Sequence, residues 1–167
     1  MHVMTDTIDI PDHRTGEFPP VEAILPHRGT MLLIDAVLSC DDHALTAEAG
    51  VHGDAWYADA DGAMPAWIGI ELMAQTVAAH ISLRAMQAGG RARPGVLLGT
   101  RRYTALRPAF PAGARLVIEG RELLRGEGGH SAYECTIEHD GVRWAEADIK
   151  VFQPTDFQTF IEGSVSS

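Results

Sequence analysis

The hydrophobic pattern divides the chain into two short extended segments, one long helix and four longer strands. Residues 31–37 are apolar and rich in β-formers, and residues 44–51 alternate more weakly after a polar turn. The longest periodic segment runs from Pro65 to about Gln87 and is apolar on nearly every face for four turns, which is typical of a buried helix. Four candidate strands follow, at residues 96–106, 114–124, 132–139 and 142–152.

Glycine and proline separate these elements. Gly89-Gly90 ends the helical pattern, and Asp140-Gly141 between two strand patterns is a strong signal for a short hairpin. This order predicts an α+β domain in which a six-strand antiparallel sheet wraps around one long central helix. We expect the domain at residues 21–153, after an irregular N-terminal arm at 1–20 and before a loose C-terminal tail at 154–167.

Charge and composition exclude several classes of protein. The 167 residues suit a single domain, and the formal net charge of -10 argues against nucleic acid or an anionic membrane as a partner. No apolar run is long enough for a membrane-spanning helix, and the first 12 residues lack the apolar region of a signal peptide. Cys40 and Cys135 form no CxxC pattern, as in proteins of a reducing compartment. We therefore expect a cytoplasmic protein without membrane insertion.

One carboxylate interrupts the apolar helix. Glu71 is flanked by apolar residues, and a buried carboxylate is costly unless it is paired, hydrogen-bonded or protonated. Burial raises the pKa of a carboxyl group, which makes it a usable general acid near neutral pH. Gln75 follows one turn later on the same face and is placed to hydrogen-bond this carboxyl. The structural alternative is a glutamate paired with an arginine from the sheet.

The start of the helix is the second candidate feature. Free backbone N–H groups near Ala66 and Trp67 would stabilise a developing oxyanion, such as that of a thioester carbonyl. Asp59 and Asp61 precede the helix, and we expect them to form a turn or a cap rather than to take part in chemistry.

The histidines offer no metal site. None of the eight has convincing ligand spacing with a third donor. His80 follows Glu71 by about two and a half helical turns and should not share its site. His27, between Pro26 and an arginine, is expected to pack and hydrogen-bond rather than to catalyse. His52, in the loop before the helix, is the best-placed histidine by chain position.

Three stretches resemble the FabZ-type 3-hydroxyacyl-ACP dehydratases. Residues 25–35 (LPHRGTMLLID) resemble the opening of that family, residues 64–75 (MPAWIGIELMAQ) its central helix, and residues 108–113 (PAFPAG) a turn between later strands. The loop at 59–62 (DADG) looks closest to the ApeP-like branch, dehydratase-related subunits of aryl polyene biosynthesis, a pathway of the fatty acid biosynthesis type. The resemblance runs from about residue 21 to 153 and implies the hot-dog fold.

The resemblance implies a two-residue mechanism that this sequence only half retains. In the family a histidine takes the α-proton, and a helix Glu or Asp protonates the leaving hydroxyl; Glu71 falls on the acid position. The histidine is expected eight residues before Pro65, where this chain has Tyr57. A tyrosine, with an ordinary pKa of about 10, is a poor base at neutral pH. The glycine expected after the proline is Ala66, whose backbone N–H remains.

Four interpretations follow from the missing histidine. In FabZ-like dimers the two groups of one site come from different subunits, so a His-bearing homologue in a heterodimer would complete a site with Glu71. A hot-dog thioesterase would need only the helix carboxylate. A non-catalytic acyl-binding or scaffold subunit would need neither group. In a homodimer, Tyr57 or His52 would have to be the base.

The resemblance also implies partners and a substrate tunnel. We expect at least a dimer, with the acyl chain between the helix of one subunit and the sheet of the other, and with Ala66, Trp67, Gln75 and Tyr57 as substrate-binding residues. The chain would carry no metal or redox cofactor, since acid–base groups suffice and the phosphopantetheine of ACP or CoA carries the substrate. An acidic acyl carrier protein would need a basic patch, and six arginines in one stretch are candidates: Arg91, Arg93, Arg101, Arg102, Arg107 and Arg115.

Overall fold

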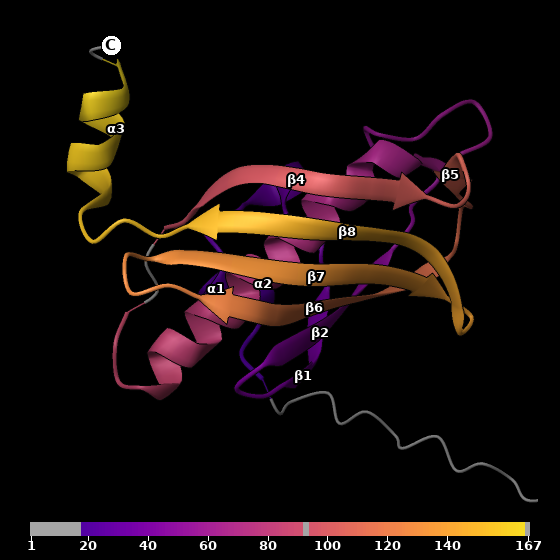
Figure 1. Cartoon of the computed structure of the whole chain (residues 1–167). Coiled ribbons are helices and arrows are strands. Elements are labelled where there is room, and N and C mark those ends of the chain that lie inside the picture. The colour runs from indigo at the N-terminus through magenta and orange to yellow at the C-terminus, as the bar shows by residue number, and fades with distance from the viewer. Residues whose placement is uncertain (1–17, 92–93, 166–167) are drawn as a thin grey trace, which may run out of the picture.

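A six-strand antiparallel sheet curls over one long helix in the computed structural model, which describes residues 18–91 and 94–165 (Figure 1). Most of the expected N-terminal arm lies outside the described residues. The strand order is β1-β2-β6-β7-β8-β4, so β1 and β4 are the two edges of the sheet. The strands are β1 (Ala36–Cys40), β2 (Ala44–Gly50), β4 (Val96–Ala105), β6 (Arg115–Arg125), β7 (His130–His139) and β8 (Val142–Phe152).

The central helix α2 spans Gly69–Gln87 and follows a short 3-10 turn, η2 (Ala66–Ile68). It ends as expected at Gly89, whose φ of 79° only glycine adopts at low cost. The Gly89 N–H donates to the Met86 carbonyl at 3.0 Å, and the next N–H donates to the Ala85 carbonyl at 2.9 Å, which satisfies the last carbonyls of the helix. No helix in the described part of the chain is long and apolar enough to span a membrane.

The core lies between α2 and the concave face of the sheet. Leu72, Met73 and Val77 of the helix are completely buried, and so are Leu116 and Ile137 on the strands. Burying an aliphatic side chain of this size stabilises the fold by about 1.5–3 kcal/mol. The all-apolar first turns of α2 thus place the helix inside the sheet, and the predicted hot-dog architecture is confirmed.

Shorter elements close the ends of the sheet. A two-residue strand, β3 (Met64–Pro65), pairs with β5 (Ala109–Phe110) just before the helix begins. Asp140 and Gly141 have φ values of 50° and 73°, as in a type I′ turn, so the predicted hairpin is confirmed.

The first predicted strand is displaced along the chain. Residues 31–37 were expected to be extended, but the 3-10 turn η1 (Gly29–Met31) comes first and follows a short helix, α1 (Val21–Ile24), while β1 begins only at residue 36. The backbone N–H groups of Leu33 and Ile34 donate to the Gln75 side-chain oxygen at 2.9 and 3.4 Å instead of to a neighbouring strand. A long-range contact therefore overrides the local β-propensity.

The predicted loose tail contains a third helix, α3 (Phe157–Val165), which lies beyond the end of the sheet (Figure 1). The Asp156 carboxylate caps its first turn by accepting from the Thr159 backbone N–H at 3.1 Å. The Phe160 ring packs against Phe152 of β8, with the two centroids 5.4 Å apart. The apolar spacing of the tail was the signal that a helix forms there.

The edge strand β4 is tied to the start of the central helix by Tyr103. Its hydroxyl donates to the Ala66 carbonyl, and burial raises the pKa of Tyr103 to about 12. Gly69 makes this contact sterically possible, because a Cβ there would overlap the Tyr103 hydroxyl and lie 3.0 Å from Ile137 Cδ1. The absence of a side chain at Gly69 therefore fixes the distance between β4 and the helix.

The first prediction concerns Gly69→Ala. An alanine normally stabilises a helix interior by up to about 1 kcal/mol relative to glycine. Here we expect a loss of about 1–3 kcal/mol, since the Tyr103 hydroxyl is displaced from its acceptor. Urea denaturation measures the change. In a Tyr103→Phe background the same substitution should cost less, and a stabilised Gly69→Ala protein would contradict the described packing.

The second prediction concerns alkaline pH. Because the pKa of Tyr103 is raised, the folded chain retains a proton that the unfolded chain releases between about pH 10 and 12, so stability falls as the pH rises through this window. At about pH 11 the tyrosinate absorbance of the native protein should be lower than in urea. Burial also raises the pKa of Tyr133, so Tyr103→Phe should remove only part of this difference.

Candidate functional site

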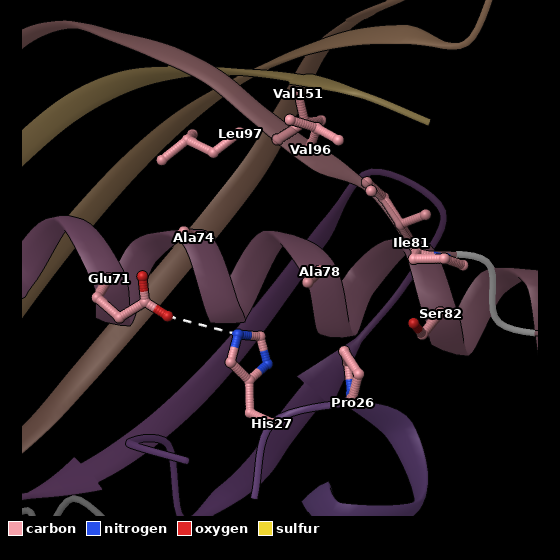
Figure 2. Close-up of a pocket in the computed structure, with 12 residues that line it drawn as sticks. Pro26, His27, Glu71, Ala74, Ala78, Ile81, Ser82, Val96, Leu97 and Val151 are labelled. Carbon is pink, nitrogen blue, oxygen red and sulfur yellow. Dashed lines mark ion pairs between the residues drawn. The ribbon is translucent and has the colours of Figure 1, made fainter. Parts of the chain in front are cut away.

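An apolar groove of ≈ 250 Å³ runs along α2, between the helix, the loop at Pro26-His27 and the strands β4 and β8 (Figure 2). One stripe of the helix forms its floor: Glu71, Ala74, Ala78 and Ile81, at helical spacing. Leu97 of β4 lies on the opposite wall. This explains why apolar residues occur on nearly every face of the helix. One face packs into the core, and the opposite face lines this groove.

Glu71 lies at one end of the groove and is less buried than the sequence suggested. Its side chain is 39% exposed, and among the described residues no arginine pairs with it. Its Oε1 accepts a hydrogen bond from Gln75 Nε2 at 2.9 Å, which confirms the predicted contact one turn along the helix. The carboxyl is held in place but remains open to the groove.

Gln75 is the buried anchor behind Glu71. It is completely buried, its Nε2 also donates to the Met31 carbonyl at 2.7 Å, and its Oε1 accepts from the Leu33 N–H at 2.9 Å. The backbone donors and acceptor around it fix which way the amide points. The structure places Gln75 behind the carboxylate rather than in the groove, so it supports Glu71 instead of lining the groove as expected.

His27 is the functional candidate that the sequence reasoning missed. Its Nε2 lies 3.5 Å from Glu71 Oε1, and both side chains face the groove (Figure 2). Its loop is fixed by Arg28, whose guanidinium donates to the Leu25 and His27 carbonyls at 2.6 and 2.7 Å. The sequence reasoning expected His27 to pack and hydrogen-bond, and the structure adds that the group it faces is Glu71. The available signal was its position inside the 25–35 stretch that resembles the dehydratases.

The other residues expected to bind substrate lie elsewhere. Tyr57 is buried, and its hydroxyl accepts from the His52 backbone N–H at 3.0 Å. Trp67 is 63% exposed and does not line the groove. The Ala66 N–H donates to the Pro108 carbonyl at 3.0 Å, where β3 meets β5, so it is not free for an oxyanion. Tertiary contacts thus engage the Tyr57 hydroxyl and the Ala66 N–H within this chain, whereas Trp67 lies outside the groove.

Two expectations of purely structural roles are confirmed. The Asp59 carboxylate accepts from the Asp61 and Ala63 N–H groups, both at 2.9 Å, and so forms a turn. His80 is completely buried 2.9 Å from the Tyr133 hydroxyl, and burial lowers the pKa of this imidazole. Within residues 18–91 and 94–165, no three His, Cys, Asp or Glu side chains are grouped as a metal site would require.

Three of the six arginines in the arginine-rich stretch have partners in the described part of the chain. Arg102 pairs with Asp148 at 3.1 Å, Arg107 lies 4.6 Å from the centroid of the Trp144 ring, and Arg115 pairs with Glu48. Arg93 lies outside the described residues. At least three of the arginines expected to bind an acidic carrier protein therefore already contact other residues of this chain.

Comparisons with known proteins agree on one family. The family model for ApeP-like proteins, described as ApeP dehydratase, matches residues 19–162. The FabZ 3-hydroxyacyl-ACP dehydratases of Brucella ovis and Brucella suis are each 36% identical over 135 residues, which covers 76% of this chain and 82% of theirs.

Among solved structures, the dehydratase heterocomplex ApeI:P from Xenorhabdus doucetiae matches with a TM-score of 0.81 and 27% identity, over 87% of this chain and 97% of that one. The acetyl-CoA-bound smu.793 protein of Streptococcus mutans shares the fold, with a TM-score of 0.58 and 18% identity over 77% of this chain and 94% of its own. Fold, motifs and relatives agree: this chain is a FabZ-like hot-dog protein and belongs to the ApeP-like dehydratase family.

Proposed function

We propose that this chain supplies the general acid Glu71 to a composite 3-hydroxyacyl-thioester dehydratase site, completed by a histidine from a second, related chain. The observation that carries the proposal is the carboxyl of Glu71 at one end of an apolar groove, with one oxygen bound by Gln75. The base is absent where the family places it, because Tyr57 is buried with its hydroxyl engaged by the His52 N–H.

The chemistry requires one base and one acid on opposite sides of a single bond. The partner's histidine takes a proton from C2 of the thioester, the C2–C3 double bond forms, and the C3–O bond breaks. Glu71 gives its proton to the departing hydroxyl, so water and a 2-enoyl thioester leave. These steps use acid–base groups alone, so we propose no metal or redox cofactor. The phosphopantetheine arm of an acyl carrier protein would deliver the substrate.

The edge strand β4 is where we place the partner. It is an outermost strand of the sheet, ten residues long, and Leu97 at its start also lines the groove (Figure 1). Leu98 beside it is 50% exposed. Long uncovered edges are rare in stable proteins because their N–H and C=O groups pair with other strands. A chain paired along β4 would cover the groove and bring its own side chains to Glu71. The ApeI:P dehydratase heterocomplex, a relative, supports association with a second chain.

The third prediction tests the acid. The chain with a His-bearing FabZ-type partner should convert a 3-hydroxyacyl-ACP to the enoyl form, detected by mass spectrometry as loss of water, and the chain alone should not. Glu71→Gln should lower the rate of the complex by about 10²- to 10⁴-fold, since a neutral amide cannot donate the proton.

Glu134→Gln, on the exposed outer face of β7, is the matched control and should leave the rate unchanged. Water loss by the chain alone would show a self-sufficient enzyme, and release of free acid would show a thioesterase. If the complex keeps full activity with Glu71→Gln, the chain is a scaffold rather than a source of the acid.

The fourth prediction tests the interface. Leu98→Asp places a charge beside the β4 edge and should dissociate the assembly, because pairing would desolvate the carboxylate. Leu123→Asp is the matched control, since Leu123 is 58% exposed on the interior strand β6. Sedimentation velocity distinguishes the two, and an unchanged assembly with Leu98→Asp would place the interface elsewhere.

A further inference from the structure

We infer that His27 is a positioning residue: its Nε2–H donates to Glu71 Oε1 and leaves Oε2 as the oxygen that exchanges a proton with the substrate. The inference rests on the proposed role of Glu71 as the acid, and it assigns separate functions to the two carboxyl oxygens. It also explains how a histidine can lie in the groove without replacing the missing base.

Two nitrogen donors converge on the same carboxyl oxygen. Gln75 Nε2 lies 2.9 Å from Oε1, and His27 Nε2 lies 3.5 Å from the same oxygen. The Gln75 amide is held in place by the backbone around Met31 and Leu33. In Figure 2 the second carboxyl oxygen points away from His27, toward the β4 side of the groove. Oε2 is therefore the oxygen presented to a bound acyl chain.

The surroundings of the second ring nitrogen determine where the imidazole proton lies. His27 Nδ1 is buried and has no hydrogen-bond partner among the residues that the structure describes. A proton on Nδ1 would be a buried, unsatisfied donor, whereas a proton on Nε2 meets the carboxylate. The Nε2–H tautomer is therefore favoured over the Nδ1–H tautomer. In this tautomer the only free lone pair is sealed from the groove, so His27 cannot take the α-proton.

The backbone around His27 supports a fixed ring position. Pro26 precedes it, and the Arg28 guanidinium donates to the carbonyls of Leu25 and His27. The adjoining helix α1 is anchored in the core through Val21. A loop held in this way can orient a carboxyl at the cost of little entropy on substrate binding.

The fifth prediction tests the tautomer without turnover. Long-range ¹H–¹⁵N NMR of the full chain distinguishes a protonated from an unprotonated ring nitrogen, and His27→Asn identifies the signals of this ring by their loss. We expect the proton on Nε2 at neutral pH. A proton on Nδ1, or a doubly protonated ring, would overturn the inference whether or not the complex is active.

The same variants test the role in catalysis. His27→Gln places an amide nitrogen near the position of Nε2, whereas His27→Asn reaches only the position of Nδ1. In the complex with the His-bearing partner, His27→Asn should lower kcat about 10- to 100-fold with little change in KM, and His27→Gln should recover most of the rate. Circular dichroism and sedimentation verify that both variants fold and assemble.

The outcomes separate this inference from the proposed function. If Glu71→Gln abolishes activity while both His27 variants retain full kcat, Glu71 is the acid and the positioning role is wrong. Equal losses in both His27 variants, accompanied by a rise in KM, would mean that the imidazole packs against substrate instead of orienting the carboxyl. If Glu71→Gln leaves the rate unchanged, the proposed function fails, and the catalytic part of the inference fails with it.

Discussion

The side-chain amide of Gln75 is the contact on which the site depends. Its oxygen accepts from the Leu33 and Ile34 N–H groups, and its nitrogen donates to the Met31 carbonyl and to Glu71. Every contact is made inside the protein, where an unmatched amide would be costly. This single group binds the chain before β1 to the helix and fixes one oxygen of the carboxyl. The loop that carries His27 precedes this segment directly, so it also lies against the helix.

The same helix sequence builds the core and the groove. Leu72, Met73 and Val77 face the sheet, whereas Ala74 and Ala78 face the groove, and both sets are apolar. Alanines leave room that larger side chains would fill, so a slot remains between the helix and β4. An apolar slot beside a long edge strand leaves hydrophobic surface and backbone groups uncovered in one place. In the proposed function, substrate binding and subunit association would use this one surface, which gives a physical reason for a site shared between chains.

The sequence pattern correctly predicted the features that depend on residues close together in the chain. The helix and its glycine end, the Asp140-Gly141 hairpin and the contact from Gln75 to Glu71 all depend on neighbours within a few residues. The errors arose where distant segments compete for the same groups. Leu33 was expected in a strand because nothing nearby shows that Gln75 will bind its N–H. The contact between His27 and Glu71 joins a loop to a helix far along the chain, and periodicity carries no information on it.

Tyr57, which stands where the family has its histidine, is packed inside this chain. Tyr57 is buried, its hydroxyl accepts the His52 N–H, and its ring lies edge-to-face with Trp56 at 5.6 Å between centroids. An imidazole there would lose most of this contact and is too short to place a ring nitrogen where the tyrosine oxygen accepts, so the N–H would lose its partner. The loop before the helix has therefore become a structural element, while Glu71 keeps its open carboxyl and its anchor. A chain that keeps the carboxyl but has a buried tyrosine in the base loop suits the shared site proposed above, because dehydration by Glu71 would require a second chain that supplies the base.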